Sequence, residues 1–142
     1  MTHITETEGE FAGWQTWPDE VFEYESAGPF YFKELDGDYV SRFRAARKHM
    51  NAGGVMHGGC LMSFADFSLF AIAAEEMEGI YGATVAFNCE FLQGPVIGDL
   101  MEARGEVLRA GKSIIFVRGI ITGEGKPCLN FSGTIKKFKP RA

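Results

Sequence analysis

The pattern of apolar and polar residues divides the chain into one central helix and a set of strands. Residues 58–78 are apolar at almost every position of the first five turns and end in a group of glutamates. A helix that is apolar around its whole circumference is enclosed by other parts of the protein and does not lie on a surface. This segment is therefore predicted to be a long helix at the centre of the fold.

The residues around this helix alternate between apolar and polar, as is typical of strands. Two short strands are predicted before it, at residues 30–33 and 39–45, joined by a hairpin-type connection. Four longer strands follow it, separated by turns that contain glycine: 83–92, 99–109, 113–122 and 127–137. An antiparallel sheet that curls around one helix satisfies this order, so the predicted fold class is α+β.

The N-terminal part of the chain follows a different pattern. Residues 1–29 are predicted to be a lead-in segment, loosely ordered up to residue 17 and with a short helix that begins at Pro18 and is ended by Gly28 and Pro29. Residues 30–142 are predicted to form the main domain. Phe11, Trp14 and Trp17 lie in the otherwise polar lead-in and need a surface on which to dock.

Composition and charge restrict the classes of function. The chain has 142 residues, of which 46% are hydrophobic and 23% charged, as in an ordinary globular domain. A net charge of −5 offers no basic surface for nucleic acid. The apolar helix is too short and too polar to span a membrane, and the acidic N-terminus is not a signal peptide. Three cysteines without disulfide spacing indicate reduced thiols and a cytoplasmic protein.

The most informative stretch lies at the start of the central helix. Residues 51–59 read Asn-Ala-Gly-Gly-Val-Met-His-Gly-Gly, and Asp66 follows seven residues later among phenylalanines and alanines. Glycines at a helix start allow another molecule to approach the free N–H groups, which attract negative charge. Burying a carboxylate costs free energy, so an acid at this apolar position is expected to have a specific role. Catalysis is the leading one.

The order of elements and the spacing of Asn51, His57, Gly58 and Asp66 resemble the hot-dog fold thioesterases. Within that superfamily the chain looks closest to the PaaI-like and 4-hydroxybenzoyl-CoA thioesterase-like acyl-CoA thioesterases. The resemblance covers about residues 30–138 and implies an antiparallel sheet wrapped around one long helix. It implies hydrolysis of acyl-CoA thioesters without a cofactor, since coenzyme A is part of the substrate.

The resemblance also implies an assembly. Active sites would lie at a dimer interface, with Asn51 and Gly58 from one subunit and Asp66 from the other. Thr84 stands where a serine or threonine of this branch often places the attacking water. A homodimer is the expected minimal unit, and a homotetramer the expected assembly, because a curled sheet leaves open edges that pairing can satisfy.

Each candidate catalytic residue has a functional and a structural interpretation. The Gly58 N–H suits an oxyanion, yet the glycine could simply permit a tight entry into the helix. Asp66 could activate water, attack the carbonyl, or belong to a structural hydrogen-bond network. Asn51 could orient the carbonyl or shape its own turn. His57 is interpreted as orienting the loop or contacting the substrate, because a helix N-terminus disfavours a protonated imidazole.

Further residues are candidates for substrate binding. Gly59, Met62 and Phe67 lie near Asp66 in the sequence. Coenzyme A phosphates could bind Arg109, Lys112, Ser113 and Lys136, which could equally be solvated turn and strand residues. An aromatic acyl wall would favour aromatic or medium-chain acyl groups over acetyl, and its candidates, besides Met62 and Phe67, are Trp14, Trp17, Phe22, Phe70, Phe87 and Phe91. Most of these rings could instead belong to the core.

Alternative functions depend on the same residues. No set of His, Cys and acidic residues has the spacing of a metal site. A non-catalytic domain that binds acyl-CoA would share the fold but has no use for a carboxylate beside a thioester. A hot-dog hydratase or dehydratase moves a proton on carbon with a histidine and an acid, and no second acid accompanies Asp66 in the motif. The sequence therefore favours an acyl-CoA thioesterase.

Overall fold

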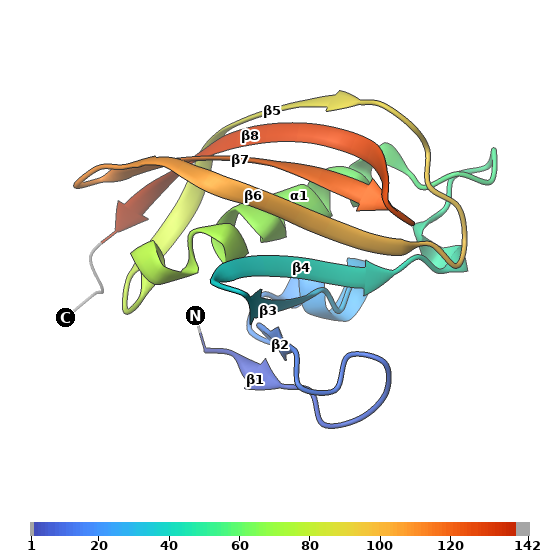
Figure 1. Ribbon diagram of the computed structural model, residues 1–142, viewed down its shortest axis with the longest axis horizontal. Helices are drawn as coiled ribbons and strands as arrows, with labels where there is room; N and C mark the ends of the chain where they lie inside the picture. The colour runs from blue at the N-terminus through green and yellow to red at the C-terminus, as the bar shows by residue number, and fades with distance from the viewer. Residues whose placement is uncertain (1, 139–142) are drawn as a thin grey trace.

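The computed structural model describes residues 2–138 and consists of one antiparallel sheet wrapped around one helix (Figure 1). The sheet has eight strands in the order β1-β2-β3-β4-β6-β7-β8-β5. The strands are β1 (Ile4–Thr5), β2 (Gln15–Thr16), β3 (Tyr31–Leu35), β4 (Asp38–Arg44), β5 (Tyr81–Phe91), β6 (Leu100–Ala110), β7 (Ile114–Gly123) and β8 (Lys126–Phe138). The predicted sheet around a helix is confirmed, and each predicted strand begins and ends within a few residues of an observed one.

The central helix α1 (Gly58–Ile72) is shorter than the predicted range of 58–78. It is followed by the 3-10 helix η3 (Ala74–Met77) and by Gly79, whose φ of +70° favours glycine. These residues turn the chain from the helix axis into β5, which is why the α-helix cannot continue. Two further short helices are η1 (Phe22–Ala27), a π-helix in the predicted helical segment, and η2 (Arg47–His49).

The core lies between α1 and the concave face of the sheet. Phe30, Phe43, Phe64 and Phe67 are each at most 2% exposed, and the Phe43 and Phe64 rings lie 4.7 Å apart in an edge-on arrangement. The helix approaches β8 so closely that a Cβ at Gly133 would lie 2.5 Å from a methyl carbon of Leu69. The apolar helix is thus enclosed on its sheet side, as its sequence predicts.

The N-terminal segment is more ordered than the sequence indicates. The strands β1 and β2 extend the sheet beside β3, so the expectation of a loosely ordered segment up to residue 17 is wrong. The Thr16 hydroxyl donates to the Phe30 carbonyl at 2.7 Å, and Lys48 donates to the Gly28 carbonyl at 2.5 Å. Trp14 and Trp17 dock and become buried. These anchors hold η1 against α1.

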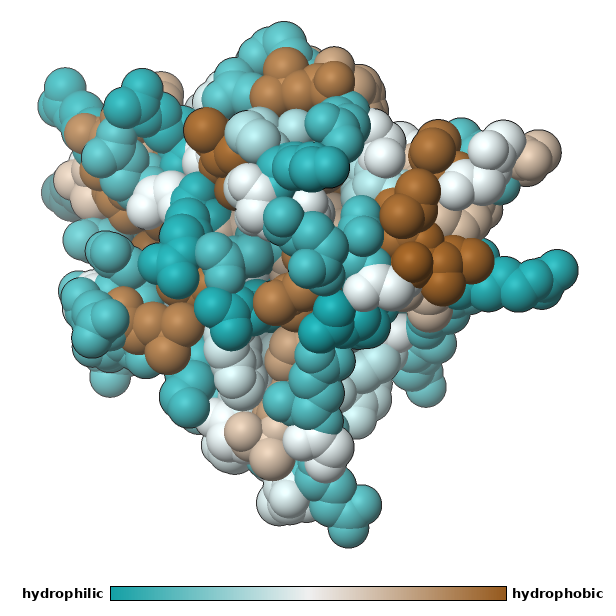
Figure 2. Space-filling model, turned by 45° about the vertical axis from the view of Figure 1, so that its right-hand side comes forward, coloured by the Kyte–Doolittle hydropathy of each residue, from teal (hydrophilic) through white to brown (hydrophobic). Residues whose placement is uncertain are grey.

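One long edge of the sheet has no neighbour within residues 2–138. Strand β5 pairs with β8 on one side only. It carries Tyr81, Val85 and Phe91, which are between 55% and 58% exposed. Figure 2 shows that apolar side chains on the face in view form several groups between hydrophilic ones. An unpaired edge with apolar side chains is a ready partner for another strand.

Candidate active site

Asp66 and Thr84 meet where α1 packs beside β5. The Thr84 hydroxyl donates a hydrogen bond to Oδ1 of Asp66 at 2.5 Å. Burial raises the pKa of the Asp66 carboxyl, and the hydrogen bond from Thr84 acts in the opposite direction because it stabilises the ionised form. The sequence motif and the first long strand therefore supply two groups of one site.

These two residues line a cavity of about 310 Å³. Aromatic rings of Trp17, Phe67 and Phe70 form part of its wall. The other lining residues are Glu20, Glu23, Gly82 and Ala83. The cavity thus combines an aromatic side with an acidic side, and a concave site with converging polar groups is typical of small-molecule binding.

Glu20 and Glu23 were not singled out by the sequence reasoning. They come from the lead-in segment, three residues apart and so on one face of a helical turn, which is the only signal that could have paired them. Burial raises the pKa of Glu23 to about 8, and the negative charges of Asp66 and Glu20 contribute. With that pKa, Glu23 keeps its proton near neutral pH. The cavity therefore contains three carboxyl groups, those of Asp66, Glu20 and Glu23.

The glycine motif shapes the start of α1. His57 is the N-cap residue, and its Nδ1 accepts a hydrogen bond from the Gly59 N–H at 2.8 Å. Gly58 is the first helical residue, and no group in the described part of the chain accepts from its N–H. A Cβ at Gly58 would lie 3.2 Å from the Phe91 ring. Gly58 therefore lies against the Phe91 side chain at the end of β5.

Asn51 adopts the turn geometry that its structural interpretation describes. Its Oδ1 accepts hydrogen bonds from the N–H groups of Gly53 at 2.9 Å and Val55 at 3.3 Å. The loop is closed further by a bond from the Asn51 N–H to the Val55 carbonyl at 2.7 Å. The carboxamide oxygen is thus occupied, while the residue as a whole stays exposed.

Gly58 and Asp66 lie eight residues apart on one helix. At a rise of 1.5 Å per residue their separation along the helix axis is about 12 Å. A thioester carbonyl is far too small to touch both the Gly58 N–H and a water molecule on Asp66 of the same chain. The structure brings together Asp66, in the middle of α1, and Thr84, and leaves Asn51, His57 and Gly58 at the start of the helix.

Of the apolar candidates, only some line the Asp66 cavity. Phe67 does so although it is 2% exposed, and Trp17 and Phe70 join it. Gly59 and Met62 are exposed and lie outside this cavity, as do Phe22, Phe87 and Phe91. Trp14 belongs to a separate cluster with Tyr31 and Val40 and does not line this cavity. The expectation that Trp14 contributes to an acyl wall is therefore wrong. The lead-in contributes one tryptophan to the cavity and uses the other for its own docking.

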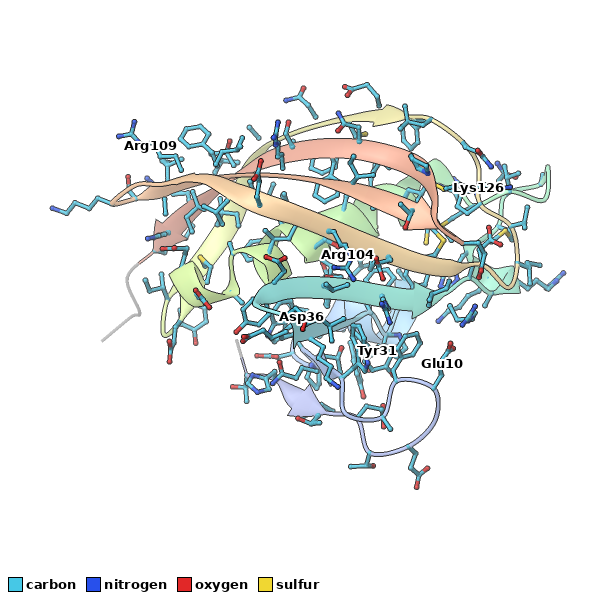
Figure 3. The ribbon with its side chains drawn as sticks, in the orientation of Figure 1. Glu10, Tyr31, Asp36, Arg104, Arg109 and Lys126 are labelled. Atoms are coloured by element: carbon cyan, nitrogen blue, oxygen red, sulfur yellow. The ribbon has the colours of Figure 1, made fainter. Side chains whose placement is uncertain are left out.

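The candidate phosphate-binding residues gather at one end of the sheet. Arg109 lies near the end of β6, Lys112 and Ser113 belong to the turn between β6 and β7, and Lys136 lies opposite Ala83 in the ladder of β5 and β8. Its neighbour Ile135 is fully buried, so Lys136 faces the outer side of the sheet. Figure 3 shows Arg109 on that outer side, away from α1. None of the four lines the Asp66 cavity.

No three His, Cys, Asp or Glu side chains among residues 2–138 come together as metal ligands would. No helix in the described residues has the length and apolar character needed to cross a bilayer.

Comparison with known proteins decides the family. The profile of the thioesterase superfamily matches residues 53–128, which is more than half of the chain and includes Gly58, Asp66 and Thr84. The chain belongs to the thioesterase superfamily. A Pseudomonas aeruginosa protein named as a candidate esterase is 31% identical over 91 residues, which cover 63% of this chain and 68% of the relative.

Solved structures of thioesterase-like proteins share the fold. A hypothetical thioesterase from Streptococcus pneumoniae, crystallised with coenzyme A, has a TM-score of 0.75 at 22% identity and covers 88% of this chain and 98% of its own. The PaaI protein of the Escherichia coli phenylacetic acid degradation operon has a TM-score of 0.67 at 25% identity, covering 77% and 79%. The fold is thus the hot-dog fold of PaaI-like thioesterases, as the sequence resemblance implies.

Proposed function

We propose that this thioesterase hydrolyses acyl-CoA to a free acid and coenzyme A. The observation that carries the proposal is the partly buried Asp66, hydrogen-bonded by Thr84, on the wall of a cavity with aromatic sides. The Streptococcus pneumoniae relative with bound coenzyme A supports the choice of thiol. Hydrolysis needs only water as the second reactant, so the proposal includes no cofactor.

In the proposed mechanism Asp66 takes a proton from a water molecule that contacts both its second carboxylate oxygen, Oδ2, and the oxygen of the Thr84 hydroxyl. The water oxygen attacks the thioester carbonyl, and the carbonyl oxygen becomes negatively charged. A Gly58 N–H stabilises that oxygen, since it is free and stands at the positive end of α1. The C–S bond then breaks, and the thiolate recovers a proton from the site.

The separation of Gly58 and Asp66 within one chain requires the Gly58 N–H to come from a second copy. The unpaired edge of β5, with its exposed apolar side chains, is the part of the surface suited to join two copies. We expect a dimer or a multiple of it in light scattering at micromolar concentration. A protein that is monomeric and fully active at that concentration contradicts the shared site.

The test of the proposed function is release of free thiol from a panel of acyl-CoA substrates, with straight-chain acyl groups of several lengths and phenylacetyl-CoA. Turnover that depends on Asp66 supports hydrolysis. Tight binding of acyl-CoA without thiol release favours instead the non-catalytic binding domain, whose fold is the same. Formation or loss of a carbon–carbon double bond with the thioester intact would favour a hydratase or dehydratase.

The titration of Asp66 and Glu23 predicts a bell-shaped dependence of kcat/KM on pH. Activity needs an ionised Asp66, so kcat/KM increases as the pH rises through the raised pKa of that carboxyl. It falls above a pH of about 8, where Glu23 loses its proton and adds a negative charge to the cavity. Glu23→Gln is expected to keep the acidic limb and to remove the alkaline one.

The matched control is Glu25→Gln, which makes the same change on an exposed residue of the same helix η1. Its pH profile is expected to follow the wild type. An alkaline limb that persists unchanged in Glu23→Gln would assign that limb to a different group.

A further inference from the structure

A second cavity adjoins the one at Asp66. This distal cavity has a volume of about 440 Å³ and lies between the N-terminal strands and the end of α1. The two cavities share exactly two wall residues, Trp17 and Phe70. They are therefore neighbouring spaces separated by a pair of aromatic side chains.

The order of the two cavities follows the helix. Asp66, Phe70 and Ala74 are spaced by four residues and lie along one side of the helical segment, with a rise of about 6 Å for each step. Asp66 lines the first cavity, Ala74 lines the distal cavity, and Phe70 lines both. A chain that leaves a thioester at Asp66 and follows the helix must pass Phe70.

The two shared residues differ in how firmly they are held. Trp17 is 7% exposed, and its ring stacks on Phe32 with centroids 4.3 Å apart. Phe70 is half-buried, and no aromatic partner for its ring is found in the described residues. Of the two side chains that separate the cavities, Trp17 is thus the fixed one, and Phe70 is the one that has room to move.

The chemistry of the distal cavity suits a hydrocarbon. Phe32, Met77 and Ile80 contribute apolar wall. The polar lining residues are His3, Gln15 and Tyr39 together with Glu75 and Glu78, and the two glutamates are exposed to solvent. Burying methylene groups against such a wall is favourable, and acidic residues on both cavities oppose an acyl group that ends in a carboxylate.

We propose that the distal cavity receives the far end of the acyl chain and that Phe70, facing Trp17, sets the chain length that the enzyme accepts. The substrate class is then uncharged acyl-CoA of medium chain length, with Phe70 limiting longer chains. This inference rests on the proposed thioesterase function and extends it to the acyl group.

The test compares kcat/KM for butanoyl-, octanoyl-, dodecanoyl- and hexadecanoyl-CoA in the wild type, Phe70→Ala and Ala74→Trp. Each methylene group that becomes buried is worth about a fourfold gain in binding. The ratio of dodecanoyl- to butanoyl-CoA is expected to rise at least about tenfold in Phe70→Ala, which joins the cavities, and to fall by a similar factor in Ala74→Trp, which fills the distal one. Taking the ratio within each variant cancels a general loss of activity or stability.

The matched control is Phe22→Ala, an exposed ring that lines neither cavity, and its ratio is expected to equal that of the wild type. Unchanged ratios in both Phe70→Ala and Ala74→Trp, with hydrolysis intact, overturn this inference and leave the proposed function standing. Absence of hydrolysis in the wild type overturns the proposed function. In that case calorimetric binding of intact dodecanoyl-CoA still tests the cavity: weaker binding to Ala74→Trp supports its role, and equal binding refutes it.

Discussion

Asp66→Asn is expected to lower kcat by about a hundredfold or more while acyl-CoA still binds. Asparagine has the size of aspartate and can still accept the hydrogen bond from Thr84, but it cannot take a proton from water. Thiol release under saturating substrate measures the loss. Near wild-type turnover in this variant would refute the mechanism.

The same substitution is expected to leave the protein folded. The pKa of Asp66 is raised by burial in the folded state, so its ionisation lowers the stability of the fold as the pH rises above the pKa of the unfolded chain. Replacing it by a neutral residue should therefore keep or raise the Tm at neutral pH. Asp36→Asn is the matched control, because Asp36 lies in the exposed β3–β4 turn with a φ of +52° that asparagine tolerates, and it should retain full activity.

Gly58→Pro is expected to reduce kcat about a hundredfold to a thousandfold, the usual effect of losing one oxyanion donor. Proline has no N–H, yet it is well suited to the first position of a helix. The preceding residue, His57, has a φ of −59° and a ψ of 134°, which is compatible with a following proline. The variant thus removes the donor with little change of the backbone.

Gly58→Ala separates the two consequences of that change. It keeps the N–H and adds only a methyl group, which must displace the Phe91 ring by a few tenths of an ångström. We expect a much smaller loss of kcat than in Gly58→Pro. Equal losses in the two variants would show that bulk beside Phe91, and not the N–H, matters at this position.

A mixture of the two inactive proteins tests whether the sites are shared. In a hybrid dimer of Asp66→Asn and Gly58→Pro chains, one site combines a native Asp66 with a native Gly58. After refolding an equal mixture, half of the dimers are hybrids, so about one quarter of the wild-type activity should return. If the mixture is no more active than the separate variants, the shared site is refuted. Either Asp66 and Gly58 of each site then come from the same chain, or one of the two takes no part in the mechanism.

Sequence patterns located the helix and the longer strands because their signals are local. Apolar residues on every side of residues 58–72 require enclosure, and the alternation after Gly79 matches the pleat of strands. The isolated Asp66 and the glycines before it were conspicuous for the same local reason. Where the signal depended on the whole fold, the predictions were less accurate: the α-helix ends early so that the chain can turn into β5, and the polar lead-in pairs with the sheet.

By itself the sequence determined the α+β class, the central helix and the carboxylate within it, since burial and periodicity depend on residue type and order. Only the tertiary structure decided which groups share a cavity with that carboxylate. Thr84 approaches from β5, while Trp17 and Glu23 approach from the lead-in, up to 49 residues earlier in the chain. Such contacts arise from strand pairing and packing across the fold, and the pKa of Glu23 depends on that burial.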